Sequence, residues 1–330
     1  MKRKFIFIFS FFSVFIFSNI TFAAITDDIE TAKNDIAYDY GLISNWASQE
    51  FSEGIAYSAV GGANRPAEVH GIGSFEIGLG VNGDVWNADT GKLRALPTRT
   101  IRTASVDYKG TVGMPGILVQ GKLGLPWDID LGLKYGGLSF KLDEGKASFN
   151  VNNTTYGFEL RRQFFGKGVT GVAFPAVSLS LTYDVASGKI DSSQTYTETT
   201  SETYSGISYT QSVDSKTTGE IKWSTQSLGL KATASKKFLF VTPYLGLGYN
   251  KNYGSVDTNI TTAGTLSLTG GGSSQSQSIN ITGSGSDTAG DSYVRYIAGF
   301  DIHILALRLN LNGEIADKYY SAGLWAHLSF

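Results

Sequence analysis

The C-terminal stretch 291–330 contains three consecutive runs in which every second residue is apolar. In the last run Leu324, Leu328 and Phe330 share one face of a strand, because the side chains of a strand alternate between its two faces. Strands of soluble sheets are typically about five or six residues long, whereas a tilted strand needs about ten residues to cross a bilayer, as these runs have. The sequence therefore predicts strands that span a membrane.

The terminal Phe330, preceded by apolar residues at every second position, resembles the C-terminal strand of Gram-negative outer-membrane β-barrel proteins. The resemblance implies that Phe330, Leu328 and Leu324 form an assembly signal for the barrel-assembly machinery. It also implies a position in the outer membrane of a Gram-negative bacterium, in contact with outer-membrane lipid. The whole chain is similar to uncharacterised envelope barrels with a helical N-terminal segment, and this similarity implies no particular activity.

Residues 1–23 have the pattern of a secretory signal peptide. Three basic residues at 2–4 precede an apolar stretch over about 5–20, and Thr-Phe-Ala at 21–23 offers small residues to a signal peptidase. An uncleaved anchor is the weaker alternative, because the stretch is shorter than the roughly 20 residues of a spanning helix. Cleavage would make the formal net charge of −2 more negative, so we expect no binding to nucleic acid.

The segment 24–66 is expected to form an N-terminal amphipathic helix, because apolar residues recur there at steps of three and four. The stripe consists of Ile29, Ala32, Ile36, Tyr40, Ile43 and Ala47. We expect an interruption at Gly41 and an end at Gly54 or at the Gly61–Gly62 pair. A single helix cannot bury such a stripe alone, so the segment must lie in the barrel lumen as a plug, at the periplasmic mouth, on a partner or on lipid.

Residues 67–330 predict an all-β fold, a transmembrane antiparallel β-barrel of about ten strands, with eight to fourteen left open. Short and long connections alternate along the chain, which favours an even strand number and two periplasmic termini. The long connections 190–215 and 251–290 are rich in Ser, Thr and Gly, which suits polar strand extensions above the membrane. Another hairpin is possible within 101–108 or within 265–281. Charges of both signs at lumen-facing positions, Asp128 among them, are expected to pair and fill a narrow interior.

Motifs that would carry catalysis or bind a cofactor are absent from the sequence. The chain has no cysteine, which excludes disulfides and thiolate metal sites. The run GLGVNG at 78–83 has the glycine spacing of a dinucleotide fingerprint but lies within a predicted strand with no helix after it. We therefore expect neither a cofactor nor an enzyme.

The chain contains only three histidines, His70, His303 and His327, and all three take the lumen-facing parity near the periplasmic ends of their strands. One hypothesis is a metal site. Another is a pH-responsive latch to acidic residues at the start of the helix. The acids of that latch would be Asp27, Asp28 and Glu30, with Asp35 on the same helix. The alternative is that three polar rim residues bond only to turns or to water.

Two functions remain open at this point. The first is a narrow gated passage or binding site for a small solute, with the helical segment as its plug, because about ten strands leave little lumen. The second is a structural or adhesion barrel that displays its long Ser/Thr/Gly-rich loops outside the cell and transports nothing.

Overall fold

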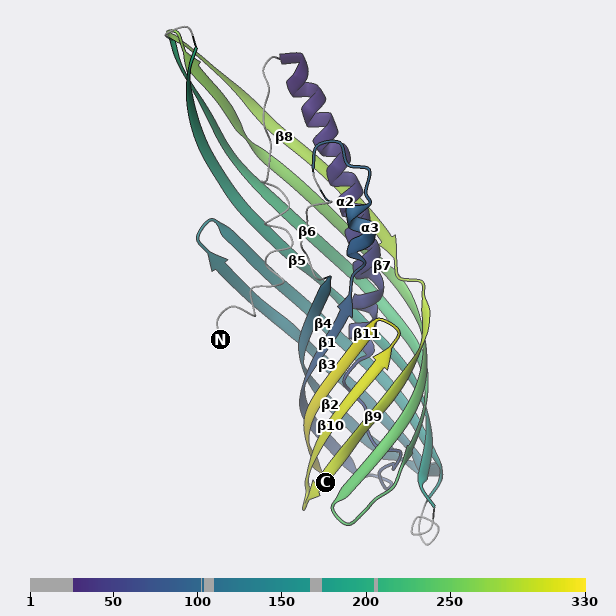
Figure 1. Ribbon diagram of the computed structural model, residues 1–330. Coiled ribbons are helices and arrows are strands. Elements are labelled where there is room, and N and C mark those ends of the chain that lie inside the picture. The colour runs from purple at the N-terminus through teal and green to yellow at the C-terminus, as the bar shows by residue number, and fades with distance from the viewer. Residues whose placement is uncertain (1–25, 102, 104–109, 167–173, 205–206) are drawn as a thin grey trace.

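The computed structural model describes residues 26–101, 103, 110–166, 174–204 and 207–330, which fold into one long helix and eleven strands (Figure 1). In chain order the elements are α2 (Thr26–Val60), β1 (Phe75–Asn87), α3 (Thr90–Arg94), β2 (Thr111–Leu125), the 3₁₀ turn η2 (Pro126–Asp128), β3 (Ile129–Glu144), β4 (Ala147–Phe165), β5 (Ala176–Tyr204), β6 (Ile207–Ser235), β7 (Val241–Gly270), β8 (Ser273–Thr288), β9 (Ser292–Ile304), β10 (Leu307–Ala316) and β11 (Tyr319–Ser329).

All strands except β8 close an antiparallel ring. Strands β1 to β7 pair in chain order, β7 pairs with β9, β9 with β10 and β10 with β11. The ring closes between β11 and β1, where Leu328 lies opposite Ile77. Strand β8 pairs only with the second half of β7, above the ring. The predicted fold class, an antiparallel barrel with an N-terminal helix, is therefore confirmed, with ten strands in the ring and β8 as an addition.

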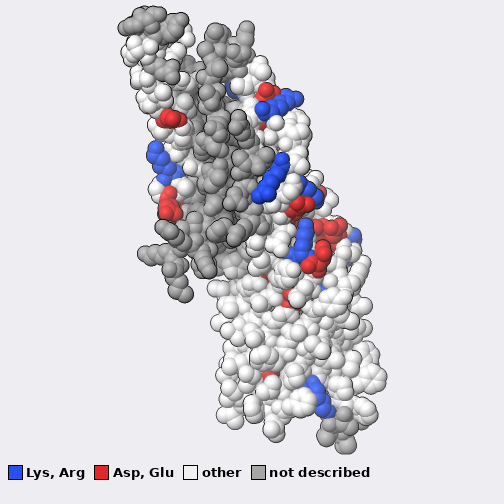
Figure 2. Space-filling model, in the orientation of Figure 1, with Lys and Arg blue, Asp and Glu red and all other residues white. Residues whose placement is uncertain are grey.

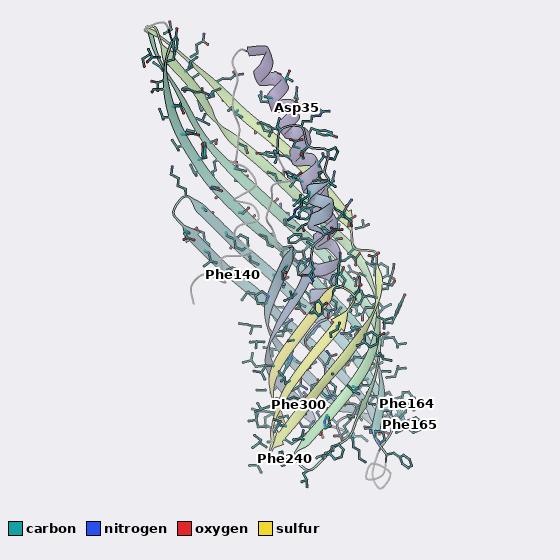
Figure 3. The ribbon with its side chains drawn as sticks, in the orientation of Figure 1. Asp35, Phe140, Phe164, Phe165, Phe240 and Phe300 are labelled. Carbon is teal, nitrogen blue, oxygen red and sulfur yellow. The ribbon has the colours of Figure 1, made fainter. Side chains whose placement is uncertain are left out.

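The lower half of the ring carries an outward-facing apolar belt bounded by two aromatic girdles, as in membrane-spanning barrels. Exposed tyrosines from six strands mark the upper boundary: Tyr135, Tyr156, Tyr183, Tyr249, Tyr296 and Tyr320. Phenylalanines mark the lower boundary, some of which are labelled in Figure 3: Phe164, Phe165, Phe174, Phe238, Phe240, Phe300 and Phe330. Between the girdles every second residue of a strand is apolar and exposed, so this surface faces lipid.

Charged side chains are divided in the same way between the upper part of the molecule and the apolar belt below it. On the face shown in Figure 2, Lys, Arg, Asp and Glu gather on the upper part, and the lower part is almost free of them. Within the described residues no helix is both long and apolar enough to cross a membrane.

Strands β5, β6 and β7 continue far above the tyrosine girdle, because each has 29 or 30 residues and a membrane crossing needs about 9–11. Together with β8 they form a four-stranded upper sheet (Figure 1). Gly271 and Gly272, with φ of 59° and 80°, form the two-residue turn between β7 and β8. The predicted polar strand extensions and the possible hairpin within 265–281 are confirmed. The possible hairpin within 101–108 falls mostly outside the described residues.

Helix α2 is continuous from Thr26 to Val60 and lies lengthwise against the inner face of the sheet, chiefly on β8 (Figure 1). The predicted interruption at Gly41 is wrong, and the helix ends at Gly61–Gly62, where Gly62 has a φ of +79°. Glycine within a helix costs about 1 kcal/mol, whereas a buried Ile such as Ile36 or Ile43 contributes about 1.5–3 kcal/mol. Packing therefore outweighs the glycine.

From Ile36 to Ala47 the stripe that the sequence predicted is buried in two apolar clusters above the membrane level, whereas Ala32 is half-buried and the side chain of Ile29 lies outside the described residues. Ile36, Tyr40 and Ile43 pack against inward-facing isoleucines of β7 and β8. Further down the helix, Phe51 packs edge-on against Trp86 of β1, with ring centroids 5.8 Å apart. Tyr40 also bonds Thr262 of β7 at 2.7 Å, and burial raises the pKa of its phenol, so that the hydroxyl stays neutral.

The helix backbone approaches β8 most closely at two glycines. A Cβ added at Gly283 would overlap Tyr40 and the backbone of Gly41, and one at Gly285 would overlap the backbone of Asn45. The hydroxyl of Ser44 donates to the carbonyl of Gly283 at 3.2 Å. These two positions therefore require glycine while α2 is docked.

We expect Gly283→Val to release the first half of α2 from β8. The added side chain collides with helix backbone that cannot move without loss of the isoleucine cluster, and overpacking of this kind costs about 1–3 kcal/mol. Hydrogen exchange of residues 36–47 should become faster. The neighbouring Ser284→Val faces outward and adds a similar side chain, so it should leave exchange in α2 unchanged. Equal exchange in both variants would contradict the proposed close approach.

The two ends of the described chain lie at opposite ends of the molecule (Figure 1). Thr26 begins α2 beside the upper sheet, whereas Phe330 pairs with Phe75 at the lower end. The expectation that both termini lie on the periplasmic side is therefore not met by residues 26 and 330. The physical reason is the apolar stripe of α2, whose buried partners lie on the upper parts of β7 and β8. The predicted signal peptide lies outside the described residues.

Candidate functional site

The candidate site is the lower lumen, where residues 61–70, called the strap here, pass down through the ring between the end of α2 and β1 (Figure 1). Barrel side chains bind the strap backbone along its length. Gly62 N donates to Glu314 Oε1 at 3.0 Å, Ala67 N to Ser235 Oγ at 3.0 Å, and Val69 N to Gln163 Oε1 at 3.0 Å. The strap is thus held by polar contacts, in contrast to the apolar docking of α2.

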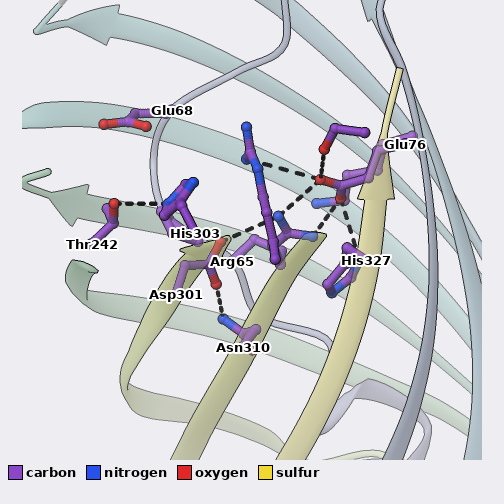
Figure 4. A network of polar contacts seen from close by, with 12 residues as sticks. Arg65, Glu68, Glu76, Thr242, Asp301, His303, Asn310 and His327 are labelled. Atoms are coloured by element: carbon purple, nitrogen blue, oxygen red, sulfur yellow. Dashed lines mark hydrogen bonds and ion pairs between the residues drawn. The ribbon is translucent and has the colours of Figure 1, made fainter. Parts of the chain in front are cut away.

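Arg65 is the most strongly bound residue of the strap (Figure 4). Its guanidinium donates to both carboxylate oxygens of Glu76 on β1, one of them at 3.1 Å, and to Asp301 Oδ2 on β9 at 3.3 Å. The side chains of Arg65, Glu76 and Asp301 are all at least 96% buried. Bidentate pairing of a guanidinium with a carboxylate is the strong and geometrically specific form of this interaction. Arg65 therefore fixes the strap to two different strands.

Buried ion pairs fill the lumen around the strap, as the mixed charges of the sequence predicted. Nitrogen–oxygen distances are 3.0 Å for Lys122–Glu159, 3.1 Å for Lys231–Glu159, 2.9 Å for Lys134–Asp184, 2.6 Å for Arg161–Asp130 and 2.6 Å for Arg295–Glu314. Asp128 does not belong to this set, because it lies half-buried in the turn η2 with a φ of 63°. A cavity of about 20 Å³ beside Asn64 remains, which has room for about one or two water molecules.

Two of the three histidines meet at Glu76, as the closure of first strand on last predicted. His70 Nε2 lies 3.2 Å from Glu76 Oε2, and His327 Nδ1 lies 3.3 Å from Glu76 Oε1. His70 also bonds Asp130 through its backbone N–H at 2.9 Å and through Nδ1 at 3.0 Å. His303 lies apart and bonds Thr242 Oγ1 at 3.0 Å. Among the described residues no cluster of three or more His, Asp or Glu is placed to hold a metal ion.

The structure does not bring Glu30 to any histidine. Glu30 lies near the start of α2, is exposed and bonds Lys33 at 2.9 Å, whereas the histidines line the ring below the other end of the helix (Figures 1 and 4). The latch that the sequence suggested is therefore not formed by Glu30, because α2 runs away from the rim rather than along it. The side chains of Asp27 and Asp28 lie outside the described residues.

Three acidic residues of α2 that the sequence analysis did not single out hold loops at the upper end. Asp39 is fully buried and accepts the backbone N–H groups of three consecutive residues, 99–101, at 2.7–2.8 Å. Glu50 accepts from Asp89 N at 2.8 Å, and Glu53 from Gly290 N at 2.8 Å. Their helical spacing was visible in the sequence, but the backbone groups that they bind come from remote loops and carry no sequence signal.

A family of unknown function, DUF6588, matches residues 108–329 of this sequence, which is about two thirds of the chain. The chain belongs to this family. Its matched region begins just before β2 and so contains every strand except β1, whereas α2 and the strap precede it. No curated protein matches the sequence.

Solved structures with a similar fold are outer-membrane β-barrels. The translocator domain of the autotransporter NalP from Neisseria meningitidis is 11% identical and has a TM-score of 0.31, with 92% of this chain and 97% of that chain covered. Ail, the attachment invasion locus protein of Yersinia pestis, is 11% identical and has a TM-score of 0.23, with 78% and 99% covered. LpxR from Salmonella typhimurium is 9% identical and has a TM-score of 0.27, with 77% and 99% covered. The closed ring and its apolar belt identify a membrane-spanning β-barrel.

Proposed function

We propose that the protein is a closed outer-membrane anchor that presents its upper sheet, β5 to β8, as an interaction surface outside the cell. The observation that carries this proposal is the length of these strands above the tyrosine girdle, which far exceeds what a membrane crossing requires. A passage for a solute needs no such sheet.

The outer face of the upper sheet is rich in hydroxyl groups that bond one another across strands. Pairs of this kind are Ser201–Thr210 at 3.1 Å, Thr261–Thr282 at 3.2 Å, Ser267–Ser276 at 3.3 Å and Thr269–Ser274 at 3.2 Å. Helix α2 covers the inner face and buries its isoleucines there. The sheet is thus supported from within and polar on the outside, as a surface that projects into water must be.

The lumen supports this proposal, because the interactions that fill it cost several kcal/mol to break. Breaking one buried ion pair by removal of a partner costs about 3–5 kcal/mol, and withdrawal of the strap breaks the contacts of Arg65 with both Glu76 and Asp301. Constant leakage of solutes is therefore not expected.

A gated passage remains the second candidate, since the strap is held entirely by polar groups that a ligand or partner can replace. The cavity beside Asn64, which Lys134, Lys231 and Arg295 help to line, offers a starting point for such exchange. Discrete conductance of the native protein in a planar bilayer would favour this candidate over the anchor.

Adhesion of cells tests the proposed function. Residues 196–215 are replaced by Asn-Gly, which shortens the β5–β6 hairpin above the Thr195–Lys216 pair and spares Thr217, which bonds Thr262, the partner of Tyr40. We expect cells with this variant to assemble the barrel normally but to lose most of their adherence to other cells and to surfaces. Unchanged adherence, with the protein correctly assembled, would contradict the proposal. A variant with Lys236 and Lys237 changed to Ser, at the lower end, serves as the control.

The proposed orientation places the short turns and Phe330 in the periplasm and the start of α2 outside the cell. An epitope inserted directly before Thr26 should then bind antibody on intact cells, with no need to permeabilise the outer membrane. An epitope inserted at Lys236–Lys237 should bind only after permeabilisation, because this turn lies at the opposite end (Figure 1). The reverse pattern of labelling would invert the orientation.

A further inference from the structure

The outer strand of the upper sheet, β8, has a long unpaired edge. Among the residues that the structure describes, β8 forms a ladder only with β7, from Ser255–Thr288 up to Gly270–Ser273. An unpaired edge presents a row of backbone N–H and C=O groups to which another strand can bind. Natural proteins usually blunt such edges with charged residues, proline or bulges.

None of these protective features is present on β8 between Ser273 and Ser286. This stretch contains no charged residue and no proline, and its register with β7 has no shift. A second edge lies on the far side of β4 from the upper sheet and differs, because the upper part of β3, beyond its pairing with β2, carries Lys141, Asp143 and Glu144. One edge is therefore protected against pairing and the other is not.

The edge of β8 is also held rigidly. Gly283 and Gly285 lie directly against the backbone of α2, and Ile279 and Ile281 are buried beneath the same helix. Ordering a segment on binding costs free energy. Because α2 has already ordered β8, a strand that pairs with this edge meets a preformed template.

The two-residue turn determines which backbone groups of β8 point outward. Residues that flank such a turn, here Gly270 and Ser273, exchange both of their hydrogen bonds with each other. The odd-numbered residues of β8 then bond to β7, and the even-numbered residues direct their N–H and C=O groups to the free edge. These even-numbered residues are Ser274, Ser276, Ser278, Asn280, Thr282, Ser284 and Ser286.

We infer that the free edge of β8 pairs antiparallel with the same edge of a second copy of this chain, anchored in an opposing outer membrane. The inference rests on the proposed function and names the partner of the displayed sheet. The partner is a second copy of this chain because the sequence of the edge is complementary to itself.

A two-fold axis at Asn280 pairs hydroxyl side chains with hydroxyl side chains on both sides of the axis. Ser278 then lies opposite Thr282, Ser276 opposite Ser284 and Ser274 opposite Ser286, with Asn280 opposite its own mate. All of these are even-numbered residues, so each pair can exchange both backbone hydrogen bonds. Hydroxyl pairs already join neighbouring strands of this sheet, as Thr261–Thr282 and Ser267–Ser276 do. A second β8 continues the same pattern without like charges in contact.

The symmetry places the two copies in different membranes. The two-fold axis of an antiparallel strand pair in one sheet is perpendicular to that sheet, and it reverses every direction that lies in the plane of the sheet. The upper sheet stands above the barrel (Figure 1), so the two barrels point in opposite directions. Pairing of β8 edges therefore joins two cells and cannot join two barrels within one membrane.

A charge exchange across the predicted pair tests this inference. In one variant Ser278 and Thr282 are both changed to Lys, and in another both are changed to Glu. Each variant alone sets like charges opposite each other in the two symmetric pairs, so cells that carry it should sediment no faster than cells without the protein. Mixed populations of the two variants, labelled with different dyes, should aggregate again with both dyes in each cluster, because Lys then meets Glu.

The control carries two lysines on the outward face of β7, Asn259→Lys and Thr265→Lys, which add the same charge one strand in from the free edge. It should aggregate like the native protein. Aggregation of the lysine variant at the native level, or mixed populations that stay dispersed, would overturn the inference. If either occurs while the shortened β5–β6 hairpin still abolishes adherence, the proposed display function stands and only the β8 pairing is wrong.

Discussion

Purified protein in a planar bilayer is expected to give no steady conductance, and deletion of residues 26–70 is expected to produce discrete open channels. The deletion removes α2 and the strap together. The ion pairs that remain, such as Lys134–Asp184 and Arg295–Glu314, lie on the barrel wall and leave the centre of the ring open. We therefore expect an all-or-none difference in conductance, with open channels in the variant and none in the native protein.

Removal of α2 exposes Trp86 and Trp223 to the lumen, so the folding of the deletion variant has to be checked. Heat-modifiable migration on gels provides this check. A second variant, Asn64→Ser with Arg65→Ser, keeps α2 and removes two of the strap side chains that bind the barrel wall. It should give brief openings. Steady native conductance, or a folded deletion variant that does not conduct, would show that the strap does not close the lumen.

We expect Arg65→Met to lower the free energy of unfolding by about 3–5 kcal/mol, the largest effect of any single substitution in the lumen. Methionine fills a similar volume but leaves the carboxylates of Glu76 and Asp301 buried without their shared cation. Removal of both charges as well, with Glu76→Gln and Asp301→Asn, should recover much of the loss, because buried neutral side chains cost less than unpaired charges.

The measurement is the urea concentration at which the barrel unfolds. Arg162→Met is the matched control, because Arg162 is exposed on the outside of β4, where its guanidinium lies over the ring of Phe164. A surface change of this kind shifts stability by about 0.5 kcal/mol or less. If Arg65→Met and Arg162→Met unfold at the same urea concentration, Arg65 does not hold the strap.

Much of the fold was predictable, because strand alternation is a local property that side chains of a barrel must obey to face either lipid or lumen. The alternation identified the runs that form β9, β10 and β11. It also placed Glu76 and the lumen histidines on the inward face of their strands. The helical stripe of Ile36, Tyr40 and Ile43 was equally clear, since its spacing follows from the helix itself.

The candidate site could be predicted only in part. Lumen parity and the closure of the ring indicated that His70 and His327 would approach each other. The importance of Arg65 was not visible, because the strap has no repeating pattern and its partners lie on β1 and β9. Its position became clear only when the ring closed around it.

The sequence by itself determined that this chain spans a membrane with strands, that its N-terminal segment is a helix with one apolar face, and that its longest connections are polar. Local periodicity carries all of this information. The tertiary structure alone decided that α2 points away from the C-terminal rim, that the strap rather than the helix passes through the membrane-level lumen, and that β8 pairs along only one edge among the described residues. These features depend on contacts between residues more than 200 positions apart, such as Tyr40 with Thr262 and Arg65 with Asp301, and no local pattern encodes them.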